Sequence, residues 1–215
     1  MYNNIMSNHN TNINTIIPGI LIEGDDYTGK TTVAKEIVKR LSEKKQKVSY
    51  GHYYLSDNPI IKFLSKKAKA SKNCAEKNKL RVAAALIDLF AFRVRKNTFY
   101  VQDRNWISIN KKYNLKRKNK LLLNHYTFSI NIYLQASLEI QKKRYIELHG
   151  QDNVSKLSNF KENLHHQTVL PPGENWYVLQ TDCKSIEEIT DEIYRLIFVS
   201  NKGNPLIFSK NNKIH

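Results

Sequence analysis

The segment from Gly24 to Thr31 has the residue types and spacing of a phosphate-binding loop. Its sequence, Gly24-Asp25-Asp26-Tyr27-Thr28-Gly29-Lys30-Thr31, matches G-x-x-x-x-G-K-[ST] at every fixed position, and a second hydroxyl residue, Thr32, follows. The glycines let backbone N–H groups point inward, and the helix that follows adds a positive dipole for phosphate. Lys30 is expected to reach the β- and γ-phosphates, and the Thr31 hydroxyl to be a Mg²⁺ ligand. The motif therefore predicts binding of a nucleoside triphosphate.

A second group of charged residues, Asp103 and Arg104, follows the short stretch 98–102, which reads as a strand. In open parallel sheets, ligands bind beyond the carboxyl ends of the strands. Glu23, the Gly24 loop and the Asp103–Arg104 pair are thus expected to converge if their strands are parallel neighbours. An exposed ion pair after a strand is the alternative for Asp103 and Arg104.

The elements around these residues are predicted from hydrophobic periodicity. A β-branched apolar run leads from Ile16 to Glu23, and apolar residues recur at helical spacing from Lys30 to Lys44. Further strands are predicted at 47–54, 98–102, 129–136 and 176–180, and further helices at 58–69, 79–95, 137–148, 160–170 and 186–197. Because strands alternate with helices, we expect an α/β fold with a parallel sheet covered on both faces.

Composition bounds the class of protein. The chain has 215 residues, 40% of them hydrophobic and 25% charged, which suits one soluble domain, expected at 16–200 between polar tails at 1–15 and 201–215. Cys74 and Cys183 lie far apart in no metal-ligand spacing, so a reducing cytoplasm is expected. Lys and Arg number 35 against 19 Asp and Glu, a formal charge of +16 that favours anionic partners, although genome composition is an alternative cause.

Two stretches taken together resemble the thymidylate kinase family and, more loosely, the deoxynucleoside kinases. They are Ile22-Glu23-Gly24-x-Asp26-x-x-Gly29-Lys30-Thr31-Thr32 and Asp103-Arg104-x-x-x-Ser108. Weaker likeness extends to Ile132-Tyr133-Leu134, to the basic helix that contains Arg144, and to Phe160-Lys161-Glu162-Asn163-Leu164. The resemblance spans roughly residues 17–197.

The resemblance implies a P-loop NTPase three-layer sandwich with about five parallel strands, and MgATP-dependent phosphoryl transfer to a nucleoside monophosphate or nucleoside. Asp26 is implied to lie near the acceptor, Arg104 to hold an acceptor phosphate, and Asp103 to orient the metal shell or the attacking oxygen. Arg144, in a lid near 141–157, is implied to reach the transferring group. Alternatives remain for Asp26, which could cap the following helix, and for Arg144, which could lie on a solvated helix face.

The sequence also departs from this family on the acceptor side. Tyr54-Leu55-Ser56-Asp57-Asn58-Pro59 stands where the thymidylate kinases have a Glu-Pro-Gly-Gly-type segment, which argues against thymidylate as the acceptor. Arg93 and Arg95 are the candidate stand-ins for the family's substrate-binding arginine. Asn105 replaces an aromatic residue, Trp106 either stacks on a base or packs in the core, and Tyr27 replaces a P-loop arginine found in some members.

Two function classes compete. A small-molecule kinase of nucleotide biosynthesis is favoured. A GTPase switch is disfavoured, because the sequence has no guanine-reading Asn-Lys-x-Asp motif: Asn119-Lys120 continues as Leu121-Leu122. The alternative is a nucleic-acid-associated NTPase or polynucleotide 5′-kinase, motivated by the basic runs 66–72 and 111–120. A kinase fold that binds nucleotide without turnover is a third reading. No membrane partner is expected, and whether the chain forms a homodimer is left open.

Overall fold

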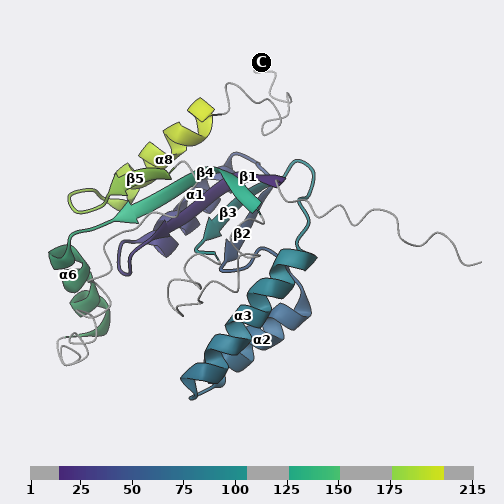
Figure 1. The fold of residues 1–215 in the computed structure, drawn as a ribbon. Coiled ribbons are helices and arrows are strands. Elements are labelled where there is room, and N and C mark those ends of the chain that lie inside the picture. The colour runs from purple at the N-terminus through teal and green to yellow at the C-terminus, as the bar shows by residue number, and fades with distance from the viewer. Residues whose placement is uncertain (1–14, 106–125, 151–175, 201–215) are drawn as a thin grey trace, which may run out of the picture.

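A five-stranded sheet forms the centre of the computed structural model, which describes residues 15–105, 126–150 and 176–200. The strands are β1 (Thr15–Gly24), β2 (Val48–His52), β3 (Phe99–Asp103), β4 (Tyr126–Gln135) and β5 (Trp176–Gln180). The helices are α1 (Lys30–Glu43), α2 (Pro59–Ala70), α3 (Cys74–Ala91), α6 (Leu138–His149) and α8 (Ile186–Ser200). Figure 1 shows the sheet with helices on its sides.

All pairings in this sheet are parallel, in the order β2-β3-β1-β4-β5. β1 is the central strand, and Ile22 lies beside both Asp103 of β3 and Ile132 of β4. A parallel sheet flanked by helices confirms the predicted P-loop NTPase sandwich. The carboxyl ends of β1 and β3 lie side by side, as the site residues require.

One face of the sheet is covered by α1 and α8. Apolar side chains of β1, β3, β4 and β5 pack there against both helices. The fully buried members include Ile20, Ile22, Ile37, Leu41, Ile132, Leu134, Ile189 and Ile193. Burying them stabilises the fold by roughly 1.5–3 kcal/mol for each large side chain, relative to leaving it exposed. This core anchors the helix that opens from the P-loop.

The opposite face carries a smaller cluster of Ile17, Leu21, Leu55, Tyr100 and Phe128. Leu55 belongs to the segment after β2, which folds back over that strand: a Cβ at Gly51 would lie 2.4 Å from the Tyr54 carbonyl oxygen. The buried carboxylate of Asp88 in α3 holds this segment, because it accepts the backbone N–H groups of Leu55 and Ser56 at 2.6–3.1 Å.

Most element boundaries agree with the predictions to within three residues, but α3 does not. It runs from Cys74 to Ala91 rather than over 79–95. Its start was missed because the cap is polar: the Asn73 side chain accepts the N–H groups of Ala75 and Glu76. Its end was placed too late, because Phe92 adopts an extended backbone although its side chain continues the apolar pattern.

Several predictions fall outside the described residues. These are the C-terminal tail, the helix at 160–170, the outer part of the lid near 141–157, Trp106, Ser108 and the basic run 111–120. The expected N-terminal tail also lies outside, except that β1 already begins at Thr15. Among the described helices, none combines the length and apolar composition that a bilayer-spanning helix requires.

The Asp88 contacts lead to a stability prediction. Replacing Asp88→Ala leaves two buried N–H groups unpaired and should lower the free energy of unfolding by about 3 kcal/mol, measured by urea denaturation. Asp57→Ala is the matched control in the same segment, since Asp57 is exposed and, among the described residues, forms ion pairs with Lys62 at 3.8 Å and Arg95 at 3.5 Å. Its loss should stay below about 1 kcal/mol. Equal effects of the two variants would refute the anchoring role of Asp88.

Candidate active site at the carboxyl edge of the sheet

The P-loop begins where β1 ends, and its first residue must be glycine because a side chain would not fit there. Gly24 has a φ of 147°, and a Cβ there would lie 2.1 Å from the Leu134 carbonyl oxygen of β4. Gly29, at the N-cap of α1, also has a positive φ of 90°. Side chains at these positions would force β1 and β4 apart or strain the turn. The loop geometry thus accounts for both fixed glycines of the motif.

Lys30 lies inside this loop rather than in solvent. Its side chain is 3% exposed, and its ammonium donates to the Asp25 carbonyl and to the Thr28 hydroxyl. The Tyr133 hydroxyl of β4 donates to the Asp25 carboxylate at 3.0 Å, which ties the loop to the sheet. Burial and the nearby Arg104 charge lower the pKa of Lys30 to about 8, although the carboxylates of Asp26, Glu23 and Asp103 oppose this shift. A polyanion bound in the loop would favour the charged form.

Asp103 is the buried carboxylate that joins the P-loop helix to the sheet. Its side chain is fully buried, and Oδ2 accepts hydrogen bonds from Thr31 Oγ1 at 2.6 Å, His52 Nδ1 at 2.8 Å and Tyr50 Oη at 3.4 Å. Burial alone would raise the pKa of Asp103, but the hydrogen bonds from His52 and Thr31 outweigh it and hold the pKa below its usual value. Asp103 is therefore ionised at neutral pH.

The donors around Asp103 fit a hard divalent cation. Asp103 Oδ1 is buried without a hydrogen-bond partner among the described residues. The other carboxylate oxygen, Oδ2, is hydrogen-bonded to Thr31 Oγ1, so the two oxygen-bearing side chains lie together. Mg²⁺ prefers oxygen ligands and commonly takes only one or two protein groups together with substrate phosphates. The described residues hold no cluster of three or more acidic, His or Cys side chains that could bind a metal by itself. Thr31 and Asp103 thus suit a metal shared with phosphate.

Arg104 is oriented by two residues from other elements. Its Nη2 lies 2.9 Å from Asp26 Oδ1 of the P-loop, and its Nη1 donates to Tyr53 Oη at 3.0 Å. Both Arg104 (φ 63°) and Tyr53 (φ 67°) have left-handed backbones, and both are held by strand-like bonds, Arg104 N to Ile22 O and Tyr53 N to Asp103 O. Such strain is concentrated at functional sites. The guanidinium is thereby fixed beside the P-loop.

Glu23 supports this arrangement from the end of β1. Its side chain is 2% exposed and accepts the backbone N–H of Asn105 at 2.9 Å. Asn105 itself is buried. This contact holds the chain directly after Arg104 against the P-loop strand, so the predicted convergence of Glu23, Asp103 and Arg104 is observed.

Arg144 of α6 reaches the same loop from the other side. Its guanidinium donates to the Tyr27 carbonyl at 3.1 Å and to the Thr181 carbonyl and hydroxyl at 2.8 and 3.1 Å. The Tyr27 ring makes edge contacts with Tyr145 and His149 of α6, with centroids 5.2 and 6.1 Å apart. Arg144 is therefore not on a solvated face. It joins α6, the P-loop and the residue after β5.

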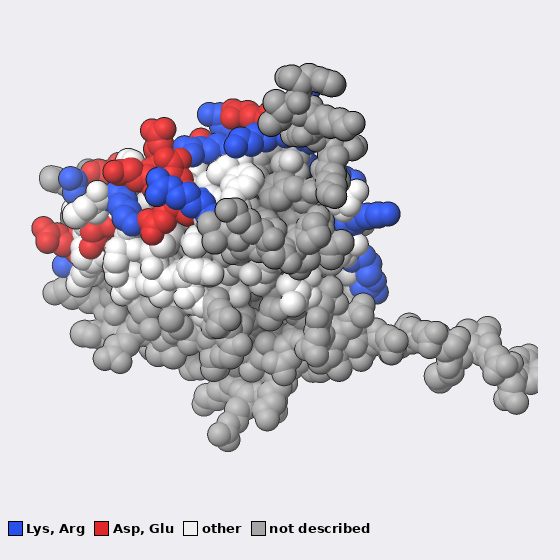
Figure 2. All heavy atoms as spheres, turned by 90° about the horizontal axis from the view of Figure 1, so that it is seen from above, with Lys and Arg blue, Asp and Glu red and all other residues white. Residues whose placement is uncertain are grey.

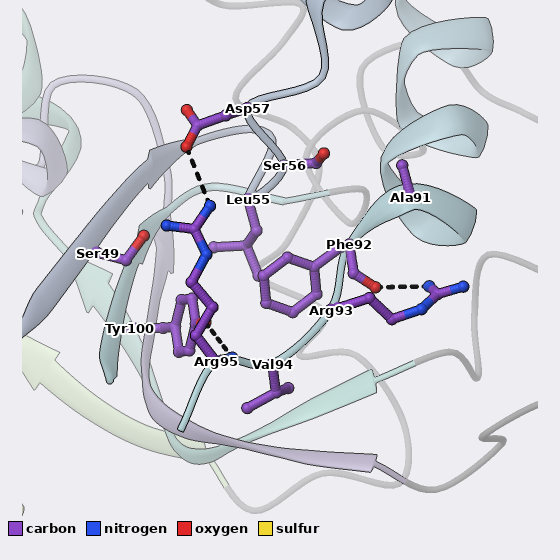
Figure 3. A pocket seen from close by; sticks show the side chains of 10 residues that line it. All are labelled: Ser49, Leu55, Ser56, Asp57, Ala91, Phe92, Arg93, Val94, Arg95 and Tyr100. Carbon is purple, nitrogen blue, oxygen red and sulfur yellow. Dashed lines mark hydrogen bonds and ion pairs between the residues drawn. The ribbon is translucent and has the colours of Figure 1, made fainter. Parts of the chain in front are cut away.

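The two arginines considered as stand-ins for a substrate arginine lie elsewhere. Arg93 and Arg95 line a cavity of about 180 Å³ between the end of α3, the segment after β2 and Tyr100 (Figure 3). Arg95 pairs with Asp57 across this cavity, and its backbone N–H is bound by the Tyr100 hydroxyl at 2.8 Å. Arg93 donates to the carbonyls of Phe90 and Phe92. P-loop residues do not line this cavity.

Three site residues were not predicted from the sequence: Tyr50, His52 and Tyr53. Tyr50 and His52 alternate along β2, and His52 lies directly opposite Asp103 in the register of β2 and β3. The alternation itself is visible in the sequence, but it does not reveal which strand β2 pairs with. Tyr53 becomes a partner of Arg104 only through the positive φ that turns the chain after β2.

Structure comparison places the fold among P-loop kinases. No protein-family model and no curated protein matches the sequence. The structure is similar to thymidylate kinase from Candida albicans, with a TM-score of 0.51 and 16% identity over 86% of this chain and 93% of that one. It is also similar to the protein APE1195, with a TM-score of 0.50 and 18% identity over 86% and 98%. At these identities the likeness establishes a P-loop kinase-like fold and no particular member.

The lowered pKa of Lys30 predicts a pH-dependent stability difference. Because the folded state favours neutral Lys30, the unfolded chain binds more protons between about pH 8 and 10.5, so stability rises with pH in that window. Lys30→Met should therefore be more stable than the parent by about 3 kcal/mol at pH 7, with roughly half of that gain left at pH 9.5. Urea denaturation at both pH values measures the difference. The control Lys35→Met, at an exposed position of α1, should show neither effect.

Proposed function

We propose that this protein transfers the γ-phosphoryl group of MgATP to a nucleoside monophosphate or nucleoside. The observation that carries the proposal is the meeting of two sets of side chains at one edge of the sheet. Lys30, Thr31 and Asp103 form a donor half, and Arg104, Asp26 and Tyr53 form an acceptor half. Phosphoryl transfer needs mainly in-line positioning and charge stabilisation, which such an arrangement supplies.

On the donor side, the P-loop backbone and Lys30 would bind the phosphates. Lys30 is already directed into the loop, and the start of α1 adds its dipole. Mg²⁺, held by Thr31 and Asp103 together with phosphate oxygens, would neutralise charge on the transferring group. His52 and Tyr50 would keep Asp103 in place by their hydrogen bonds to Oδ2, which leaves Oδ1 for the metal or its water.

On the acceptor side, Arg104 favours a phosphorylated acceptor. A guanidinium binds phosphate through two parallel N–H donors, and that of Arg104 is held next to the P-loop by Asp26 and Tyr53. Asp26 is 63% exposed, so its second oxygen can accept a hydrogen bond from a sugar or attacking hydroxyl. A nucleoside monophosphate is therefore the favoured acceptor, and a nucleoside the second.

Arg144 has a less direct part in the proposal. Its donors are bound to Tyr27 and Thr181, so reaching a γ-phosphate would require these bonds to break. In the arrangement described, Arg144 positions the P-loop at Tyr27. If α6 moved and freed these donors, Arg144 would stabilise negative charge on the reacting phosphate.

A coupled assay of ADP release tests the proposal. MgATP is combined with a panel of nucleosides and nucleoside monophosphates, and turnover should depend on one or a few monophosphates and disappear in Lys30→Ala. ADP release that is the same with and without every acceptor would refute transfer to a nucleotide.

Arg104→Met separates the two acceptor classes. Loss of a bidentate charged contact should lower kcat/KM for the monophosphate by roughly 100-fold, while turnover of an unphosphorylated nucleoside changes little. Arg195→Met, at an exposed position of α8, is the control and should leave both values unchanged. An equal loss for both acceptor classes would mean that Arg104 does not contact the acceptor phosphate.

A further inference from the structure

The helices α2 and α3 form a hairpin that projects from the sheet. They lie side by side in Figure 1 and are joined by Ser71, Lys72 and Asn73. The contact between them uses small and aliphatic side chains, which include the buried Ile61 and Ala68 of α2. The two helices contain no P-loop residue and none of the other side chains described in the candidate active site.

The tip of the hairpin carries an excess of positive charge, which we term the basic tip. It consists of Lys66, Lys67, Lys69, Lys72, Lys77 and Lys79. The carboxylate within this stretch, Glu76, pairs with Lys67 at 3.8 Å and accepts from the Ser71 hydroxyl. In the described part of the chain the other five lysines have no carboxylate within ion-pair distance, and four of them are exposed.

The face formed by α8 and α1 is different. Arg40 contacts Glu36 at 3.2 Å and also Asp191, and Lys184 pairs with Glu192. Figure 2, which looks onto the molecule from above, shows acidic and basic side chains next to one another on this side. Among the described residues, lysines without an ion pair also occur outside the hairpin, at Lys35, Lys45 and Lys47 for example. Residues 66–79 differ in their charge density, because they hold six lysines and one carboxylate.

An exposed aromatic side chain stands beside the basic tip. Phe63 of α2 is 64% exposed, and Lys66 and Lys67 follow it at the spacing that places residues on one side of a helix. Ile60, which is 53% exposed, precedes Phe63 by one turn on the same side. An exposed ring bordered by cations matches the way bases stack on aromatic side chains while cations contact the phosphates.

We propose that the α2–α3 hairpin binds single-stranded nucleic acid, with the basic tip on the phosphate backbone and Phe63 against a base. These five lysines on α2, α3 and their connection suit a polymer of regularly spaced charges better than one small phosphate compound. α2 alone has 12 residues and is about 18 Å long, enough to follow several nucleotides. A duplex would offer Phe63 no unstacked base, so a single strand is preferred.

Fluorescence anisotropy with a labelled oligothymidylate of about 20 nucleotides tests this proposal with the full chain. The logarithm of the association constant should fall linearly with the logarithm of the salt concentration between about 50 and 200 mM. The slope should be near about −3.5, since each of the five lysine–phosphate contacts contributes about −0.7 for a single strand. The triple variant Lys66→Glu, Lys69→Glu, Lys72→Glu should weaken binding at least tenfold, and Phe63→Ala about tenfold. Lys30→Ala should bind as the parent does, which separates this result from failure of the kinase proposal.

The control is a second triple variant with the same change in net charge, Lys35→Glu, Lys45→Glu, Lys47→Glu, at exposed positions outside the hairpin. It should keep most of the affinity, and circular dichroism should show both variants folded. Equal loss in the two triple variants, or salt-independent binding, would overturn the proposal. Preferential binding to an anionic membrane would also overturn the proposal. In that case the protein would sediment with vesicles of phosphatidylcholine and phosphatidylserine in roughly a 7:3 ratio, while the oligonucleotide stayed unbound.

Discussion

The buried carboxylate of Asp103 connects three elements that are far apart in the sequence. Thr31 from the P-loop helix and His52 from β2 both donate to its Oδ2, while its backbone continues β3 beside β1. A buried charge without such partners would cost several kcal/mol, and the hydrogen bonds from His52 and Thr31 offset the effect of burial and hold the pKa of Asp103 below its usual value. The hydrogen bonds to this carboxylate link the P-loop helix and β2 to the end of β3, and Arg104 follows it directly in the chain.

The parallel sheet makes this convergence possible. Because β1 and β3 are neighbours and point the same way, Glu23, Gly24, Asp103 and Arg104 meet at one edge although Glu23 and Asp103 are 80 residues apart in the sequence. The core under α1 and α8 supports this edge, and Arg144 and Tyr133 connect the P-loop to α6 and β4. Phosphoryl transfer requires side chains that are held in position in this way.

Prediction from the sequence succeeded where the signal is local. The P-loop, its flanking strand and helix, and the parallel α/β class all depend on short patterns of glycine and apolar residues. His52 and Tyr53 could not be predicted, because their roles depend on the register between β2 and β3 and on a positive φ after β2. The contacts of Arg144 with Tyr27 and Thr181 were missed for the same reason, since α6 packs on the P-loop through tertiary contacts.

One edge of the sheet is proposed to hold both the donor phosphates and the acceptor. The most direct measurement follows the label of γ-labelled ATP in a mixture with nucleoside monophosphates and Mg²⁺, with the products separated by chromatography. The label should appear in a nucleoside diphosphate, because ADP left by the donor carries no γ-label, and Lys30→Ala should abolish this transfer. Label that is released only as inorganic phosphate, whatever acceptor is present, would contradict the proposal.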